Sequence, residues 1–357
     1  MDPAIVIRRR LRAQRLTGEP FSTPLEAVRW SGAVQAQEHA EAKWSIAQRV
    51  RGADDAAVQA ALDTGEIVRT HALRPTWHFV AAEDLRWIQR LTGPRVHAVN
   101  RYAYRTNDLP PDTLARTDAA LAGILGDGEP RTRPELRSAL EALGFETPGQ
   151  RLAHAVMHAE LDALICSGPR RGRQHTYVLA DGRVPEAPDR SRDEDLAELT
   201  RRYLASHGPA GPRDLAWWSS LTVADAKHGI ALCAEALVEV APGLFATRDA
   251  EPAPSAPGGV HLIPMYDELG VALRDLKVVH AADPPPLGEL ERPVLLDGLV
   301  VGTWRRTLTA RTVTVQVRRF VPLDESVLAL LRAEAERFGA SLGLGAELEL
   351  DAGGAQP

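Results

Sequence analysis

The sequence has only two cysteines, Cys166 and Cys233, among 357 residues. Two cysteines this far apart make neither a disulfide framework nor a zinc cluster, so a reducing cytoplasm is the expected compartment. No apolar run approaches the roughly 18 residues that cross a bilayer. The N-terminus also lacks the apolar core and small-residue cleavage site of a secretory signal. These absences predict a cytoplasmic protein with no membrane partner.

Lysine is nearly absent as well. Of 42 basic residues only Lys43, Lys227 and Lys277 are lysine, and the formal net charge is −6. The negative net charge argues against a nucleic-acid partner. Nucleic-acid binding, however, requires a local basic surface and not a positive net charge of the whole protein. Residues 1–105 carry a net charge of +5 and the remainder −11. A GC-rich coding sequence is one explanation of the arginine bias. Phosphate contact by guanidinium groups is the other.

A repeated order of elements organises the first 250 residues. Helical patterns that begin at Thr-Pro, Arg-Pro or Gly-Pro signals are followed three times by a short pair of strands, which is the order of a winged helix. We therefore predict an α+β chain of four parts. They are a first winged helix over residues 1–105, a second over 106–188, a third over 189–250 and a C-terminal small β-barrel or sheet over 259–350.

The individual elements are predicted from periodicity and from turn residues. Helices are expected over residues 5–16, 40–50, 54–62, 111–125, 147–164, 193–206, 222–236 and 326–338, and shorter ones begin at Pro24, Thr132 and Gly211. Paired strands are expected at 66–70 with 76–80, 164–166 with 176–179, and 237–240 with 244–247. Further strands are expected at 294–296, 299–304 and 312–317. Residues 251–259 have the composition of a linker, and the tail from Asp351 is expected to be disordered.

Two glutamines two positions apart, Gln35 and Gln37, are the first candidates for chemistry. In a helix this spacing puts the side chains about 200° apart, whereas in an extended segment they share one face. Two neighbouring primary amides can donate to and accept from one water molecule. Two solvated glutamines produce the same pattern, so the spacing alone does not establish a site.

Short motifs along the chain resemble those of a known family. They are Pro24–Arg29 leading into Gln35-Ala36-Gln37, Leu73–Val80 followed by Asp84–Trp87, Gly168–Tyr177, His207–Ala210, Ala216–Ser219 and Asp297–Trp304. Over residues 5 to 320 the chain is similar to the AlkZ-like winged-helix DNA glycosylases. The resemblance implies three tandem winged helices in a C shape around duplex DNA, capped by a β-barrel.

The resemblance also implies hydrolysis of the N-glycosidic bond of N7-alkylated guanine, in monoadducts and in interstrand crosslinks. The family signature is Gln-apolar-Gln, here Gln35-Ala36-Gln37, and a sister branch carries Asp in the last place. Alkylation at N7 makes guanine cationic, so it leaves as a neutral base without a general acid. The protein then has to place a water and to stabilise positive charge. We expect Gln37 to position the nucleophilic water and Gln35 to orient or share it.

The turn-rich segment around residues 168–175 is the second candidate site. Within six residues, and with no acid between them, stand Arg170, Arg171, Arg173, Gln174 and His175. The resemblance makes this tip a hairpin that contacts DNA near the lesion. A solvated turn is the alternative.

Arg74 and His78 are further candidates for DNA contact. Trp77 and Phe79 are expected to face the core, which leaves His78 on the other side of its strand. A structural histidine and a surface arginine in a turn are the alternatives for these two residues.

A rival catalytic centre is Asp267, which stands with Glu268 after an apolar strand. A carboxylate in a cleft can activate water or stabilise the sugar cation, whereas an acidic turn is the structural alternative. The sequence shows no glycine-rich phosphate loop, metal-ligand spacing or nucleophile elbow, so we expect no metal and no cofactor. Lys43 is the one lysine near the glutamines, which disfavours a Schiff-base lyase activity.

Three functions stay open from the sequence. The leading one is a monomeric, monofunctional DNA glycosylase acting on double-stranded DNA with alkylated guanine, in general repair of alkylation damage or in antibiotic self-resistance. The second is a non-catalytic winged-helix regulator or lesion-binding shield, with recognition helices that begin near Arg133 and Arg213. The third is a protein that sequesters an alkylating natural product. Turnover separates the first from the others, because only a glycosylase releases base.

Overall fold

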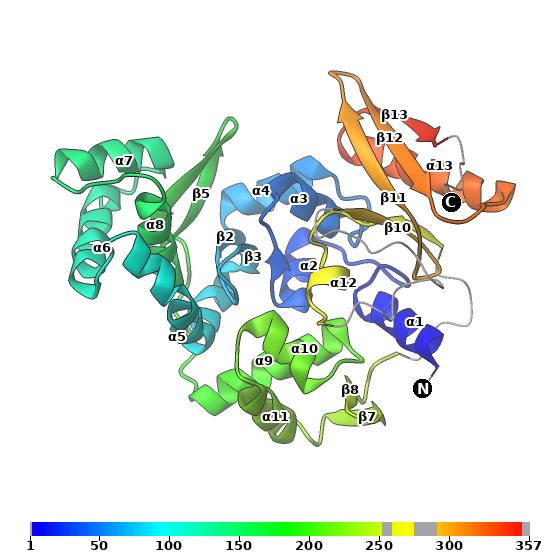
Figure 1. The fold of residues 1–357 in the computed structure, drawn as a ribbon, viewed down its shortest axis with the longest axis horizontal. Coiled ribbons are helices and arrows are strands. Elements are labelled where there is room, and N and C mark those ends of the chain that lie inside the picture. The colour runs from blue at the N-terminus through cyan, green and yellow to red at the C-terminus, as the bar shows by residue number, and fades with distance from the viewer. Residues whose placement is uncertain (1, 252–258, 275–290, 352–357) are drawn as a thin grey trace.

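The computed structural model describes residues 2–251, 259–274 and 291–351. The expected linker and C-terminal tail fall almost entirely outside these ranges. The described helices and strands make a mixed α+β fold, as predicted. Figure 1 shows the N-terminal module in the centre, a second module with its hairpin on the left, a third below and the C-terminal sheet at the upper right. None of the described helices is long and apolar enough to cross a membrane.

The N-terminal module combines short helices with a three-stranded antiparallel sheet in the order β1-β3-β2. Its elements are α1 (Pro3–Ala13), α2 (Pro24–Ser31), β1 (Val34–Gln35), α3 (His39–Ala47), α4 (Asp55–Thr64), β2 (Ile67–His71) and β3 (Trp77–Ala81). The helix starts follow the sequence signals. Thr23 Oγ1 accepts the Glu26 N–H at the start of α2, and Asp54 Oδ1 accepts the Ala57 N–H at α4. Such caps stabilise a helix by about 1 kcal/mol each.

A helix that the sequence analysis did not predict, α5 (Ala82–Thr106), joins the first module to the second. Pro94 lies inside it, and an interior proline removes a helical hydrogen bond. Its apolar side chains are nevertheless buried at helical spacing, as at Leu85, Ile88 and Leu91. Because α5 packs against both α8 and α9, tertiary contacts outweigh the proline penalty.

The second module carries the basic hairpin. Its elements are α6 (Pro111–Leu125), β4 (Arg131–Thr132), α7 (Arg133–Ala142), α8 (Arg151–Leu161), β5 (Ile165–Arg171) and β6 (Gln174–Leu179). The strand order is β4-β6-β5, so the predicted hairpin gains a third strand. Thr132 and Glu135 form a capping box at the start of α7. Helix α8 begins later than predicted, because Gly149 has a φ of 53°, which a right-handed helix does not accommodate.

The third module repeats the order of helices followed by a hairpin. Its elements are α9 (Arg192–His207), α10 (Pro212–Ser219), α11 (Val223–Leu232), β7 (Leu237–Ala241) and β8 (Leu244–Thr247). Capping boxes begin α9 at Ser191 and α11 at Thr222. The order of elements thus agrees with the sequence analysis in all three modules. Their description as winged helices, with the boundaries given above, stays a prediction.

The C-terminal part is a sheet with a long helix. Its elements are β9 (Val260–Leu262), α12 (Glu268–Val271), β10 (Arg292–Leu296), β11 (Leu299–Leu308), β12 (Thr312–Arg319), α13 (Glu325–Ser341) and β13 (Gly345–Leu350). The order is β13-β12-β11-β10-β9, and β12 and β13 are parallel with α13 as the crossover. Among the described strands β13 and β9 are the two edges, so the sheet is open. Of the barrel or sheet expected here, the described strands form a sheet, and the barrel is not confirmed.

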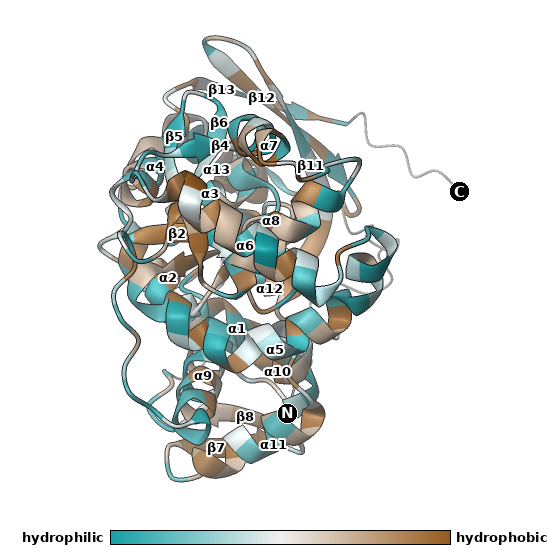
Figure 2. Ribbon diagram, turned by 90° about the vertical axis from the view of Figure 1, so that its left-hand side faces the viewer, coloured by the Kyte–Doolittle hydropathy of each residue, from teal (hydrophilic) through white to brown (hydrophobic). Residues whose placement is uncertain are grey.

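Shared aromatic cores join these parts. Trp44 of α3 and Trp304 of β11 both pack edge-on against Phe338 of α13, with ring centroids 5.0 and 5.1 Å apart. Trp87 of α5 lies in one core with Trp218 of α10. Figure 2 shows the hydrophobic colour of β2 in the interior, while the outer helix α6 carries both colours, as expected for one buried face. Burial of these large rings, each worth roughly 2–3 kcal/mol, therefore joins the N-terminal module to the C-terminal sheet and α5 to the third module.

Candidate active site and nucleic-acid interface

Gln35 occupies the short edge strand β1, directly opposite His78 of β3. Gly32 places this strand: it ends α2 with a φ of 76°, and a Cβ there would lie 3.4 Å from the Trp218 ring. Gln35 is 7% exposed, and its side-chain oxygen Oε1 has no hydrogen-bond partner among the described residues. A buried acceptor without a protein partner is available to a water or a ligand.

Gln37 lies just beyond the strand and is exposed. Both backbone groups of Ala36, the residue between the two glutamines, form hydrogen bonds. Its N–H donates to the Trp77 carbonyl at 2.7 Å, and Arg69 Nε donates to the Ala36 carbonyl at 3.1 Å. The motif therefore presents one buried amide and one exposed amide. Whether both reach the same water stays a prediction.

Glu268, a buried carboxylate at the start of α12, forms a hydrogen bond with the backbone of Gln35. Its Oε1 accepts the backbone N–H of Gln35 at 2.7 Å, and its Oε2 accepts the Trp218 Nε1–H at 3.0 Å. Burial by itself raises the pKa of the Glu268 carboxyl. The hydrogen bond and charge of His207, together with two further basic side chains, outweigh burial and lower that pKa to about 2. Glu268 is therefore an ionised carboxylate at neutral pH.

Arg74 and His78 are the two further basic side chains around Glu268. His78 is completely buried, with Nδ1 at 3.0 Å from the Thr76 carbonyl, and burial and the charge of Arg74 lower its pKa to about 3. Arg74 Nη1 donates to the Val271 carbonyl at 3.3 Å, and its Nε and Nη2 atoms are buried. Their predicted DNA contacts find no support in these positions, because His78 is completely buried and two of the three guanidinium nitrogens of Arg74 are buried.

Asp267, the rival catalytic carboxylate, is part of a buried ion pair. Arg49 donates from Nη1 to Oδ2 at 2.8 Å and from Nη2 to Oδ1 at 2.7 Å, and Ser45 Oγ donates to Oδ2 at 2.6 Å. Oδ1 also caps α12 by accepting the Leu269 N–H at 2.9 Å. The two charged side chains are 5% and 1% exposed. These contacts favour a structural role for Asp267, as a helix cap in a buried ion pair and not as an acidic turn, because its oxygens are already used within the protein.

Basic side chains from the first two modules gather beside the glutamine motif. We call this set the basic cluster, and it comprises His39, Lys43, Arg69, Arg133, Arg170 and His175. The rings of His39 and His175 are in contact, with centroids 4.8 Å apart. Burial, with the charges of the other members, lowers the pKa of His39 to about 2 and that of His175 to about 4. Both imidazoles are thus neutral at pH 7, and a phosphate placed beside them would favour their protonation.

Trp77 holds two arginines of the basic cluster in place. Its ring centroid lies 4.2 Å from Arg69 Cζ and 5.5 Å from Arg133 Cζ. Arg133 Nη2 also donates to the Tyr177 Oη at 2.8 Å. Burial lowers the pKa of Arg69 to about 10, so its guanidinium stays charged. Cation–π contacts of about 0.5–2 kcal/mol each orient these groups before any phosphate arrives.

The β5–β6 hairpin divides the predicted DNA-contacting residues into two groups. Arg170 and Arg171 are used within the protein: Arg170 Nη2 donates to the Arg173 carbonyl, and Arg171 Nη1 to Glu135 Oε1, both at 2.6 Å. Arg173 and Gln174 are exposed at the tip. Glu135 therefore offsets part of the positive charge of this run, although Arg171, like Arg173 and Gln174, is exposed.

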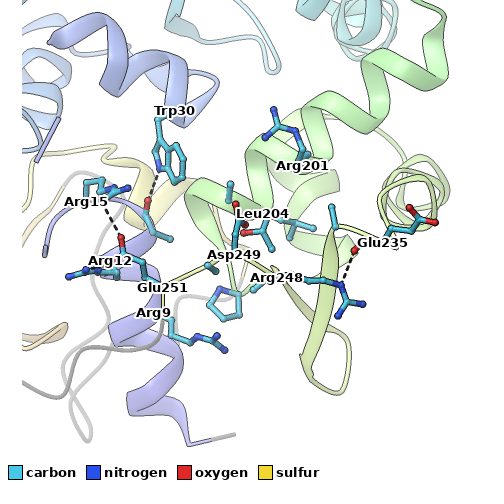
Figure 3. A pocket seen from close by; sticks show the side chains of 18 residues that line it. Arg9, Arg12, Arg15, Trp30, Arg201, Leu204, Glu235, Arg248, Asp249 and Glu251 are labelled. Atoms are coloured by element: carbon cyan, nitrogen blue, oxygen red, sulfur yellow. Dashed lines mark hydrogen bonds and ion pairs between the residues drawn. The ribbon is translucent and has the colours of Figure 1, made fainter. Parts of the chain in front are cut away.

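A cavity of about 510 Å³ between α1, α9 and β8 contains no residue of the glutamine motif. Figure 3 shows Arg12 and Arg15 reaching Glu251 within it, and Trp30 Nε1–H donating to the Ala13 carbonyl at 2.7 Å. Glu251 offsets part of the arginine charge there. The glutamine motif with its exposed Gln37 lies elsewhere.

Sequence reasoning missed several members of this site. They are Glu268 as the partner of Gln35, and His39, Lys43, Arg69 and Arg133 of the basic cluster. The available signals were weak: Glu268 follows Asp267, and His39 stands two residues after Gln37. Packing of α12 against β1, and of β5 against β2 and α4, brings these distant segments together.

Comparisons with known proteins identify the family. A family model described as "DNA glycosylase AlkZ-like" matches residues 28–341. A relative from Streptomyces sahachiroi, named interstrand DNA cross-link repair glycosylase, is 27% identical over 323 residues, or 82% of this chain and 85% of the relative. The solved structure of Streptomyces sahachiroi DNA glycosylase AlkZ matches with a TM-score of 0.79 and 22% identity, covering 97% of this chain and 98% of that one. The chain therefore belongs to the AlkZ-like DNA glycosylase family and is a DNA glycosylase.

Proposed function

We propose that this DNA glycosylase hydrolyses the N-glycosidic bond of N7-alkylated guanine in duplex DNA, including bulky adducts and interstrand crosslinks. The observation that carries the proposal is the position of Gln37, which is exposed beside the basic cluster and next to a Gln35 whose backbone Glu268 holds. The Streptomyces sahachiroi relative named for interstrand cross-link repair supports the substrate class.

The protonation states of the site favour a leaving group that needs no acid. Glu268, with a pKa near 2, is ionised, and His39 and His175 are neutral, so none of the three is a suitable acid for a departing base at neutral pH. Guanine alkylated at N7 already carries a positive charge and leaves as a neutral base. The remaining demands are a placed water and stabilisation of the oxocarbenium-like sugar.

Each side chain of the motif has its own task in this mechanism. The exposed amide of Gln37 holds the nucleophilic water in line with C1′ of the sugar, and the gain is positioning rather than strong basicity. Gln35 Oε1, buried and unpaired among the described residues, orients or shares that water. The carboxylate of Glu268 behind them favours positive charge developing at the sugar.

Duplex DNA lies along the basic cluster and the hairpin tip in this proposal. The guanidinium group of Arg133 meets phosphates, the buried Arg69 adds positive charge beside it, and Arg173 with Gln174 probes a groove near the lesion. We expect a monomer, because three modules of one chain already make a continuous DNA surface in this proposal; shared cores join the first module to the second and to the third. The two free, buried cysteines suit a reducing cytoplasm.

The two alternatives from the sequence are not favoured. A non-catalytic regulator or shield loses its support, because the matching family and both relatives above are glycosylases. Sequestration of an alkylating natural product has no specific observation in its favour. The same motifs suit general repair and antibiotic self-resistance, and the choice of alkylating agent depends on the side chains around Gln37.

Base release from a duplex oligonucleotide with one N7-methylguanine tests the proposal. Alkali cleaves the strand at each abasic site, and a gel resolves the products. We expect Gln37→Ala to lower the excision rate at least roughly 100-fold, because a positioned contact to the water is lost. Gln35→Ala is expected to lower it by a smaller factor. Gln150→Ala is the matched control, since Gln150 is an exposed glutamine without a side-chain capping hydrogen bond.

The outcomes separate the parts of the proposal. Full activity of the Gln37 variant would refute the water-positioning role. A wild-type protein that binds duplex but releases neither N7-methylguanine nor a bulkier N7 adduct would refute the substrate class. A duplex with a defined crosslink is the next substrate, and separated strands on a denaturing gel are the expected product.

A further inference from the structure

Titratable side chains from three helices converge in the second module, outside the glutamine site and the basic cluster. Helix α8 and the residue that ends it present His154, His158 and Asp162 at intervals of four, which places all three on one helical face. His97 of α5 and Asp118 of α6 face this row. No step of the proposed excision mechanism uses any of them.

The distances within this set are short. His97 Nε2 lies 3.0 Å from Asp162 Oδ1, and His158 Nδ1 lies 3.6 Å from Asp162 Oδ2. His158 Nδ1 is also 2.9 Å from Asp118 Oδ2. One ligand atom each from His97, His158 and Asp162 lies within 4.8 Å of the others. Three potential metal-binding atoms therefore surround one point.

These separations suit a tetrahedral metal ion. Zinc bonds to nitrogen and oxygen are about 2.0–2.1 Å long, so neighbouring ligand atoms around zinc lie roughly 3.3 Å apart. The two histidine–carboxylate distances, 3.0 Å to Oδ1 and 3.6 Å to Oδ2 of Asp162, lie on either side of that value, and all three ligand atoms are within 4.8 Å of one another. Binding of one ion therefore requires side-chain rotations that bring the three ligand atoms closer together.

Two further observations point to a ligand at this place. Tyr104 Oη lies 2.9 Å from His97 Nδ1, which holds the ring with Nε2 toward the cluster, and metal-bound histidines regularly have their second nitrogen fixed in this way. Two buried atoms nearby, Asp118 Oδ1 and His154 Nδ1, also lack a hydrogen bond among the described residues. A network of histidine–carboxylate hydrogen bonds alone accounts for the short contacts but not for these unpaired atoms.

We propose that His97, His158 and Asp162 bind a divalent transition-metal ion, zinc above all, and that this ion clamps α5 to α8. Asp118 is the nearest further carboxylate and completes the coordination with or without a water. Mixed imidazole and carboxylate donors select zinc over magnesium and calcium, which prefer oxygen ligands throughout. The role is structural, because the ion ties the long connecting helix to the module that carries the basic hairpin.

Titration of the full-length protein with zinc chloride tests the site. We expect one equivalent to bind by calorimetry, and saturating zinc to raise the melting temperature by roughly 5 °C. Cobalt chloride is expected to bind at the same place with visible absorption typical of tetrahedral nitrogen and oxygen ligands. Asp162→Asn and His97→Ala are expected to remove both effects. Asp162 is half exposed, so its variant keeps the fold.

Two more variants sharpen the test. Tyr104→Phe keeps all ligands but frees the His97 ring, so zinc affinity is expected to fall roughly tenfold. His228→Ala is the matched control, because His228 pairs with one carboxylate, Asp193, at 3.1 Å on the surface. Zinc binding that is absent in the wild type at roughly 100 µM, or that survives unchanged in Asp162→Asn and His97→Ala, would overturn the proposal.

Discussion

Gln35 and Glu268 meet in a buried hydrogen bond of 2.7 Å, from backbone N–H to carboxylate, although 233 residues separate them in the chain. The same carboxylate accepts from Trp218 of the third module. One residue of the C-terminal part therefore links two other modules at the glutamine motif. β1 is held by β3 on one side and by Glu268 on the other, which orders the edge strand before substrate binds.

Glu268 is expected to make folding stability sensitive to acid. Its pKa of about 2 in the folded protein lies below the ordinary 4.5, so its contribution is complete above pH 4.5 and is lost as the pH falls toward 2. The shift corresponds to about 3 kcal/mol. The difference in unfolding free energy between wild type and Glu268→Gln should shrink between about pH 6 and pH 3 in urea denaturation. A difference that is constant over this range would contradict the assignment.

Substitution of Asp267 is expected to affect folding and not chemistry. Asp267→Ala leaves Arg49 as an uncompensated buried charge, so the free energy of unfolding should fall by about 3–5 kcal/mol. The excision rate per folded molecule should be that of the wild type. Gln37→Ala should show the opposite pattern, with stability retained and excision lost. A slow, fully folded Asp267→Ala enzyme would restore Asp267 as a catalytic candidate.

DNA binding is expected to take up protons at His39 and His175. Burial and neighbouring charges hold their pKa values near 2 and 4, so both are neutral in the free protein. Nearby phosphates raise these pKa values, and affinity for duplex should therefore increase as the pH falls from about 7 to about 5. Fluorescence anisotropy of wild type and a His39→Gln, His175→Gln double variant measures this. The double variant should have a flatter pH profile, and His228→Gln should match the wild type.

The two arginine groups of the hairpin are expected to differ in their electrostatic effect. Arg173 is exposed, whereas Arg171 is already paired with Glu135. Arg173→Ala should weaken duplex binding and reduce the slope of log affinity against log salt by about one. Arg171→Ala should change the slope less. Equal slopes for both variants would show that Glu135 releases Arg171 in the complex.

Local signals in the sequence were enough for many elements. Thr23-Pro24 starts α2, Thr132 with Glu135 starts α7, and the turn around Gly172 makes the hairpin, because each depends on hydrogen bonds or φ angles within a few residues. Helix α5 was missed because no cap marks its start and Pro94 interrupts its pattern. Only its packing against two modules makes it a helix of 25 residues.

The sequence alone determined the order of helices and hairpins, the Gln35-Ala36-Gln37 motif and, through short motifs along the chain, the resemblance to a glycosylase family. Tertiary structure decided what surrounds that motif. Of two adjacent acids, it turned Glu268 toward Gln35 and Asp267 toward Arg49. Such choices depend on side chains that are distant in sequence and meet only after the modules pack. No local periodicity or capping preference predicts these long-range contacts.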